Sequence, residues 1–260
     1  MRTATMNIFG EGPDWEYRRT VLAAGFADLA PDLVTLQEVV VDGGRDQARE
    51  ILGAGYHLVR QREVGAARMS AVIASRWPIG RTVEVNLHLT EGSASTTMIS
   101  EIDAPAPIGP LWLVHHLPDW WLDHEHERQL QAVAAARTVA ELAAERSGHV
   151  VLAGDLNADP EAASVRFWTG HAALDGMSVC YRDAWVSARP GEPGRTFVPE
   201  NPYAADGDWP FRRIDYVMVR CGTHGGPTLR ITGCERIFDR PGAVASDHYG
   251  LVADLEPPGR

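Results

Sequence analysis

The chain has 260 residues, of which 45% are hydrophobic and 23% are charged, a composition typical of a globular protein with a substantial core. Its formal charge is −11, so it would approach a polyanionic nucleic acid against long-range repulsion. All 24 basic residues are arginine, which excludes lysine nucleophiles, Schiff bases and P-loop chemistry.

The cysteines and the apolar segments indicate the cellular compartment in which the protein is expected. Cys180, Cys221 and Cys234 are odd in number and show no Cys-x-x-Cys spacing, which predicts neither a disulfide framework nor a zinc site. We expect core cysteines, Cys180 included, in a reducing compartment. The N-terminus lacks a signal-peptide pattern and no stretch approaches 18 apolar residues, so we expect a cytoplasmic protein.

The first half of the chain is predicted to alternate strands with two helices. Strands are expected at residues 2–8, 33–38, 56–60, 70–75, 82–89, 96–102 and 111–116. A helix over 15–29 places Leu22, Phe26 and Leu29 on one face, with Asp14 as its N-cap, and a shorter helix covers 47–52. The apolar run at 33–36 shows little alternation, as in a strand covered on both faces.

The second half begins with the longest predicted helix, over 125–146, whose alanines and valine recur on one face before Gly148. A strand at 149–154 follows, and Asp159 with Pro160 predicts the start of a helix that runs through 167. Residues 186–213 are rich in Gly, Pro and Asp and predict a long surface loop. Two final strands are expected at 214–220 and 251–255, and they flank a variable stretch that contains 228–234.

The order of these elements predicts the architecture. Strands arrive in two batches, each accompanied by helices, which suggests two packed sheets with helices outside. We find no internal repeat and no linker long enough to divide the chain. We therefore expect one domain over residues 1–260.

Polar residues stand at the ends of several predicted strands, where packing does not require them. Glu38, Asp155 and Asn157 each follow an apolar run, two histidines end another run, and Asp247-His248 precedes the last strand. Such side chains held by a rigid scaffold would form a cup of oxygen and nitrogen ligands. Oxygen-dominated ligand sets select hard cations such as Mg²⁺ or Mn²⁺.

Six motifs in order resemble the endonuclease/exonuclease/phosphatase superfamily, with its DNase I-like fold. They are Asn7, Leu36-Gln37-Glu38, His116-Leu117, Gly154-Asp155-Leu156-Asn157, Arg213-Ile214-Asp215-Tyr216 and Ser246-Asp247-His248. Each motif alone is weak, but six in order over nearly the whole chain are specific. The resemblance implies an α/β (α+β) four-layer sandwich of two mostly antiparallel sheets flanked by helices, and a metal-dependent phosphoesterase.

The resemblance also implies a metal site. Glu38 would be the principal ligand, with Asn7 beside it, directly or through water. Asp247 would be a second ligand or a support for the site. The implied ion is Mg²⁺, with Mn²⁺ or Ca²⁺ as alternatives.

The remaining motifs imply the catalytic groups. Asp155 would orient or deprotonate the attacking water, and Asn157 would hold phosphoryl oxygens. Asp215 would fix the tautomer of His248, and either member of that pair serves as base or as transition-state stabiliser. His116 would donate to a non-bridging oxygen or to the leaving group.

Two questions of site geometry stay open at this point. Neighbours in a strand face opposite sides, so only one of His115 and His116 can enter the site; we favour His116 and keep His115 as the alternate. Predicted loops beside the motifs carry aromatic and charged residues that would help to choose the substrate, or would instead pack on their own backbone. These candidates are Asp119, Trp120, Trp121, Trp209, Phe211 and Arg212.

Three functions are weighed. The favoured one is hydrolysis of a phosphodiester or phosphomonoester in a small molecule, nucleotide or lipid. A DNA or RNA nuclease is the alternative, against which the acidity and the absence of lysine and of basic runs weigh. A binding protein without catalysis ranks last, because it should have lost at least one motif. No membrane segment is expected.

Overall fold

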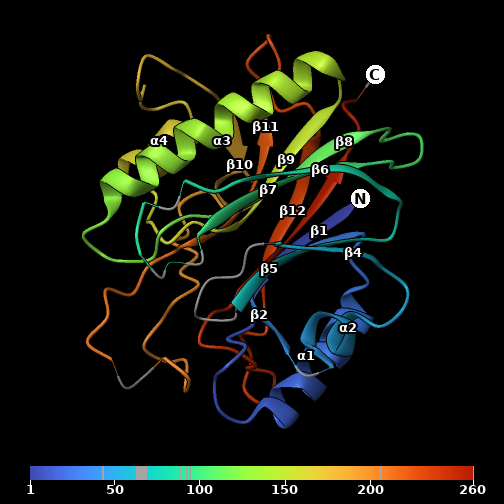
Figure 1. Ribbon diagram of the computed structural model, residues 1–260, viewed down its shortest axis with the longest axis vertical. Coiled ribbons are helices and arrows are strands. Elements are labelled where there is room, and N and C mark those ends of the chain that lie inside the picture. Colours follow the sequence, from blue (N-terminus) through green and yellow to red (C-terminus); the bar gives the residue numbers. More distant parts are fainter. Residues whose placement is uncertain are drawn as a thin grey trace.

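Two β-sheets lie face to face, and helices cover the outer face of each, as the ribbon of the computed structural model shows (Figure 1). The structure describes residues 1–42, 44–62, 69–87, 89–91, 93, 95–204 and 207–259. The four-layer arrangement confirms the fold class expected from the motifs.

The first sheet combines the two ends of the chain. Its strand order is β12-β13-β1-β2-β5-β4, with β3 paired to β2. Only β1 and β2 pair in parallel, and the other neighbours are antiparallel. The strands are β1 (Arg2–Asn7), β2 (Leu33–Asp42), β3 (Arg45–Asp46), β4 (His57–Arg60), β5 (Met69–Ser75), β12 (Arg230–Ile237) and β13 (Gly250–Glu256).

The second sheet is built from the middle of the chain. Its order is β10-β11-β9-β8-β7-β6, and only β8 and β9 pair in parallel. Both sheets are therefore mostly antiparallel, as predicted. The strands are β6 (Ile79–Val85), β7 (Thr96–Ile102), β8 (Leu111–Leu117), β9 (His149–Asp155), β10 (Tyr181–Asp183) and β11 (Asp215–Arg220).

Three apolar cores hold the layers together. One lies between the sheets and includes Ile73, Leu113 and Val217, all fully buried. A second packs α3 (Glu125–Glu145) and α4 (Ala163–Trp168) on the second sheet, and a third packs α1 (Trp15–Leu29) and α2 (Gln47–Leu52) on the first. Each large apolar side chain so buried contributes about 1.5–3 kcal/mol. The short α5 (Ala184–Ala188) contacts β11 and β12.

Three predicted strand and helix bounds are wrong. The strand predicted at 33–38 continues to residue 42, because a bulge at Glu38 bends it without ending it. The strand expected at 82–89 instead covers Ile79–Val85, and His88 lies outside the described residues. The helix expected from Asp159 begins at Ala163, because the Asp159 carboxylate accepts the backbone N–H of Glu161 in a separate turn.

Local interactions overturn three further expectations. Asp14 has a left-handed backbone with φ 56° and makes no side-chain cap on α1. The stretch 186–213 is not purely a surface loop, since α5 overlaps its start and Thr196 and Asn201 inside it are fully buried. Cys180 is exposed at the surface, whereas it was expected in the core.

Membrane-spanning segments were also sought. In the described part of the chain, no helix is both long enough and apolar enough to cross a bilayer.

Candidate functional site

A cavity of about 680 Å³ opens at the end of the sandwich where the predicted motifs meet. Its polar wall is formed by Glu38, Asp155, Asn157, Asp247 and His248. Glu38 comes from β2 and the pair 247–248 precedes β13 in the first sheet, whereas Asp155 ends β9 in the second. Both sheets therefore contribute to one polar surface.

Glu38 sits where β2 departs from regular pairing. The register with β5 shifts between Leu36 and Val39, and Glu38 has φ 57°, a conformation uncommon for a residue with a side chain. A bulge re-aims one side chain without ending the strand. Here it brings the Glu38 carboxylate, partly exposed, to the cavity.

Asn7 joins the two sheets beneath the cavity. At the end of β1 its amide nitrogen donates to a carboxylate oxygen of Glu38 at 2.9 Å and to one of Asp155 at 3.2 Å. Its amide oxygen accepts the backbone N–H of Phe9 at 3.0 Å. The side chain is buried, so these bonds fix the two carboxylates relative to each other.

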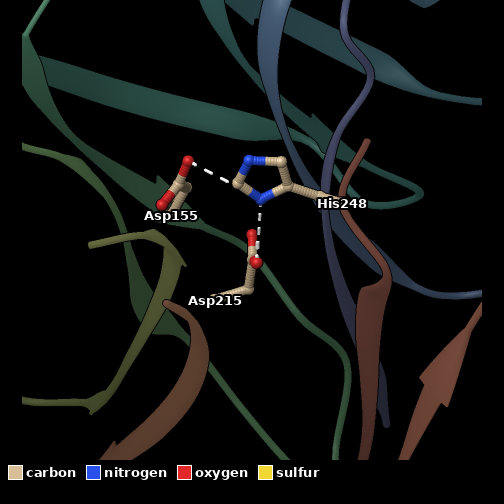
Figure 2. Close-up of side chains that lie close together, drawn as sticks. All are labelled: Asp155, Asp215 and His248. Atoms are coloured by element: carbon tan, nitrogen blue, oxygen red, sulfur yellow. Dashed lines mark hydrogen bonds and ion pairs between the residues drawn. The ribbon is translucent and has the colours of Figure 1, made fainter. Parts of the chain in front are cut away.

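Two aspartates converge on the His248 ring, as Figure 2 shows. The Nδ1 atom of His248 lies 3.1 Å from Oδ2 of Asp215 and 3.9 Å from Oδ2 of Asp155. All three side chains are buried. The second carboxylate oxygen of Asp215 has no hydrogen-bond partner among the described residues, so this aspartate is held mainly by the imidazole.

The charges in this group shift one another's pKa. Burial alone would lower the pKa of His248, but the neighbouring Asp215 and Asp155 raise it well above its ordinary 6.5. Burial raises the pKa of Asp155 to about 7, against the opposing charge of His248. Burial also raises the pKa of Glu38, and the nearby carboxylate of Asp247 raises it further.

Asn157 lies on the same side of the cavity as Asp155. Its backbone N–H donates to Oδ1 of Asp155 at 2.9 Å, and its amide nitrogen donates to the carbonyl of Pro118 at 3.2 Å. Its φ is 52°, a left-handed value that asparagine tolerates better than most residues. The turn after β9 thus holds Asp155 and presents Asn157 to the cavity.

Two sets of residues could hold a metal ion. The buried Asp155, Asp215 and His248 offer ligand atoms within 4.8 Å of one another. Glu38 and Asp247 form the other set, because both are partly exposed carboxylates on the cavity wall and repel each other. Oxygen donors of this kind fit a hard divalent cation.

The two adjacent histidines of β8 are buried and point to opposite sides of the strand, as predicted. His115 lies 2.6 Å from the amide nitrogen of Gln37, between the sheets. His116 lies 2.7 Å from the Thr97 hydroxyl, with its ring edge against Trp168 of α4. Neither ring is among the described residues that line the cavity.

Some of the loop residues proposed to choose the substrate lie at the cavity mouth, whereas Asp119 is fully buried and Phe211 is not among the described lining residues. Trp120, Trp209 and Arg212 line it, and Trp121 stacks on Trp120 with ring centroids 4.4 Å apart. The three tryptophans are each nearly half exposed. Arg212 is the one arginine among the described lining residues.

Three further aromatic residues of the wall were missed by the sequence analysis. Phe9, Phe197 and Tyr203 line the cavity, and the Phe197 ring lies 5.2 Å from that of His248. They lie outside the helices and strands, where no periodicity marks a residue as buried or exposed. Their only shared sequence signal is that they are aromatic, and Phe9 alone lies close to a recognised motif residue, Asn7.

Arg18 is a fully buried cation that the sequence analysis also missed. Its guanidinium binds five backbone carbonyls, four in the β1–α1 connection and one just before the 246–248 motif. The carbonyls are those of Ile8, Phe9, Gly12, Pro13 and Ala245, at 2.6–3.2 Å. One side chain thus ties together two segments that carry cavity residues.

Comparisons with known proteins agree with this geometry. The model of the Endonuclease/Exonuclease/phosphatase family matches residues 4–248. No curated protein is similar enough in sequence to count as a match.

Similar structures are found among solved proteins. Truncated TDP2 from Caenorhabditis elegans has a TM-score of 0.76 and 20% identity, covering 98% of this chain and 97% of that one. TDP2 from D. rerio, solved with a single-strand DNA product, has a TM-score of 0.74 and 18% identity, covering 98% of each chain. The human Nocturnin catalytic domain, solved with a sulfate anion, has a TM-score of 0.74 and 16% identity, covering 99% of this chain and 94% of that one. At these identities the likeness shows the fold.

Proposed function

Because the chain belongs to the endonuclease/exonuclease/phosphatase family, whose members are hydrolytic phosphoesterases that generally use a divalent metal, we propose that it hydrolyses a phosphate ester with such a metal. The proposed substrate is a phosphodiester or phosphomonoester of a small molecule, a nucleotide or a lipid. One observation carries the proposal: the carboxylates of Glu38 and Asp247 line the same cavity as His248, whose Nδ1 contacts Asp215.

Glu38 and Asp247 are the proposed metal ligands. Both carboxylates face the cavity, and a divalent cation held by them would relieve their mutual repulsion. Mg²⁺ is the proposed ion, with Mn²⁺ or Ca²⁺ as alternatives. The group Asp155, Asp215 and His248 suits a metal less well, because Nδ1 of His248 already contacts Asp215. A divalent ion would supply Lewis-acid stabilisation of the phosphoryl oxygens.

Asn7 is proposed to act through its neighbours. Its amide nitrogen donates to both Glu38 and Asp155, so it fixes the position of one proposed metal ligand relative to the residue proposed to act on the attacking water. Its amide oxygen accepts one hydrogen bond, from Phe9, so Asn7 would contact a metal through the remaining lone pair of that oxygen or through water.

The remaining polar groups are proposed to serve the attack on phosphorus. Asp155 orients or deprotonates the attacking water. Asp215 holds Nδ1 of His248, which leaves Nε2 to bind or protonate an oxygen of the phosphoryl group. Asn157 donates to a non-bridging oxygen once its amide leaves the Pro118 carbonyl. Together these groups stabilise charge on the equatorial and leaving oxygens.

The two histidines of β8 are proposed to support the site indirectly, without contacting the substrate. A direct role for His116 requires its ring to leave Thr97 and turn toward the cavity. The Gln37 contact likewise holds His115 between the sheets. We therefore propose that both position the end of β8, and that Nε2 of His248 is the imidazole atom that reaches the substrate.

The walls of the cavity favour a substrate with a flat or apolar group. Trp120, Trp121 and Trp209 are nearly half exposed, and covering them on binding would bury a large apolar area. Arg212 at the same mouth is suited to a phosphate oxygen, because its guanidinium presents several donors. We propose that these four residues hold the part of the substrate beyond the scissile bond.

The test is a hydrolysis panel with and without metal. Bis-p-nitrophenyl phosphate, p-nitrophenyl phosphate, plasmid DNA, RNA and phospholipids are incubated with Mg²⁺, Mn²⁺ or Ca²⁺. We expect turnover of at least one ester, loss on chelation, and kcat/KM lower by about 10²–10⁴-fold in Glu38→Gln and His248→Ala.

Matched controls separate chemistry from folding. Glu235→Gln and His57→Ala alter exposed residues of the same types and should keep wild-type rates. If wild type turns over nothing, or if the site variants match the controls, the hydrolase proposal fails.

A nuclease is the alternative, and the DNA product in D. rerio TDP2 is the observation that keeps it. The charge of −11 and the absence of lysine weigh against broad binding of a polyanion. Preferential cleavage of DNA or RNA over the small esters would favour the nuclease. Metal-independent binding with no turnover of any substrate would favour a non-catalytic protein.

A further inference from the structure

Two cysteines face each other at the end of the β10–β11 pair. Cys180 precedes β10 and Cys221 follows β11, and the antiparallel register pairs Tyr181 with Arg220. The next pair outward is therefore Cys180 with Cys221, and the backbone N–H of Cys221 donates to the carbonyl of Cys180 at 2.8 Å. The two thiols also share a hydrogen bond.

This placement meets the geometric demands of a disulfide. Directly opposed residues of antiparallel strands have Cα atoms about 4.5–5.5 Å apart, within the range of about 4.4–6.8 Å found across disulfides. A side chain at Gly170 would put its Cβ 3.2 Å from Sγ of Cys180. Glycine at this position leaves the thiol room to turn toward its partner.

The pair is open to solvent, whereas the third cysteine is not. Cys180 is exposed and Cys221 half-buried, and both line a cavity of about 580 Å³ beside α3. Burial and the Cys180 thiol raise the pKa of Cys221 to about 11, against a smaller opposing effect of the Arg182 charge. Cys234 is 2% exposed in the core, and burial raises its pKa to about 12. Reaction with an oxidant should therefore begin at Cys180.

We propose that Cys180 and Cys221 are a redox modification site that closes reversibly to a disulfide with a low-molecular-weight disulfide as oxidant. The thiolate of Cys180 attacks one sulfur of the oxidant and expels a small thiolate. The thiolate of Cys221 then attacks Sγ of Cys180 and expels the second. Two protein thiols are oxidised, the small disulfide is reduced to two thiols, and the protons of the protein thiols pass to the leaving groups.

The test equilibrates the purified chain in buffers of reduced and oxidised glutathione. Free thiols are counted after denaturation and peptides are mapped by mass spectrometry. We expect wild type to lose two of its three thiols and to yield one linked peptide containing Cys180 and Cys221, reversed by dithiothreitol. The cross-link closes a loop of about 40 residues and should raise Tm by roughly 5–15 °C.

Single substitutions distinguish this reaction from non-specific oxidation. Cys221→Ser should trap glutathione on Cys180, and Cys180→Ser should form no internal cross-link and gain no Tm. Cys234→Ala should behave like wild type; if it fails to fold, the peptide map of wild type decides. Three free thiols in a buffer poised near about −200 mV, or glutathione on wild-type Cys180 without the linked peptide, would overturn the proposal.

Discussion

Arg18 shows how one residue far from the chemistry can shape the cavity. Its guanidinium is fully buried and is satisfied by five backbone carbonyls, with no carboxylate among its hydrogen-bond partners. The carbonyls come from the connection that carries Phe9 and from Ala245, two residues before Asp247. Hydrogen bonds to a charged group are worth about 1.5–3 kcal/mol each, and a lost partner leaves buried carbonyls unpaired.

Replacing Arg18 should therefore cost both stability and function. We expect Arg18→Leu to lower the free energy of unfolding by about 3–5 kcal/mol and to weaken metal binding, because the carbonyls around the cavity lose their common donor. Urea unfolding and metal titration measure the two effects.

A neighbour on the same helix provides the control. Arg19→Leu removes a partly exposed arginine paired with Glu16 and should cost less than about 1 kcal/mol. Equal losses in the two variants would contradict the role given to Arg18.

Among the elements, β8 places two neutral histidines inside the protein. Burial lowers the pKa of His115 and of His116 to about 3, from the ordinary 6.5. Below pH 6.5 these two histidines bind protons in the unfolded chain but stay neutral in the folded chain. Each histidine therefore lowers stability progressively as pH falls from 6.5 toward 3, by about 1.4 kcal/mol per pH unit.

This linkage predicts a crossover in stability. His116→Gln removes one such group. The free energy of unfolding of this variant, relative to that of wild type, should therefore rise by about 2–3 kcal/mol as the pH falls from 6.5 to 4.5. Urea unfolding at a series of pH values measures the difference, and His57→Gln, at an exposed position, should run parallel to wild type. A His116→Gln curve parallel to wild type would mean that the ring is protonated in the folded chain.

The elements also show where prediction from sequence succeeds and where it stops. The α3 helix was predicted within one residue, because its apolar spacing follows the helical period over many turns. The bulge at Glu38 was not predicted, because nothing local distinguishes a strand that bends from a strand that ends. The late start of α4 was missed because Asp159 and Pro160 suit a turn as well as a helix start.

At the scale of the whole molecule, the candidate site is formed by residues from both sheets. The motifs could be recognised from their order, and the structure brings Glu38, Asp155 and His248 to one cavity. The placement of His116 against Trp168 could not be foreseen, because α4 covers that face only in the assembled fold. The expectation of one domain over residues 1–260 stays a prediction.

A metal site built from two segments far apart in the chain exists only in the folded protein, so metal binding should stabilise the native state. A divalent ion at about 100 times its Kd should stabilise the native state by about 2.7 kcal/mol, or roughly 5–10 °C in Tm, and a chelator should reverse this. Glu38→Gln should lose the shift, measured by differential scanning fluorimetry. Glu235→Gln should keep it, and an equal shift in both variants would remove Glu38 from the metal site.

The position of β13 has a consequence for how the protein comes into being during translation. The last strand of the chain pairs with the first, β1, in the interior of its sheet. Asp247 and His248 are added to the growing chain about 200 residues after Glu38. A nascent chain, or a product of premature termination before residue 247, carries Glu38 and Asp155 but lacks the imidazole that completes the cavity. The proposed site therefore stays incomplete until residue 248 has been added to the chain.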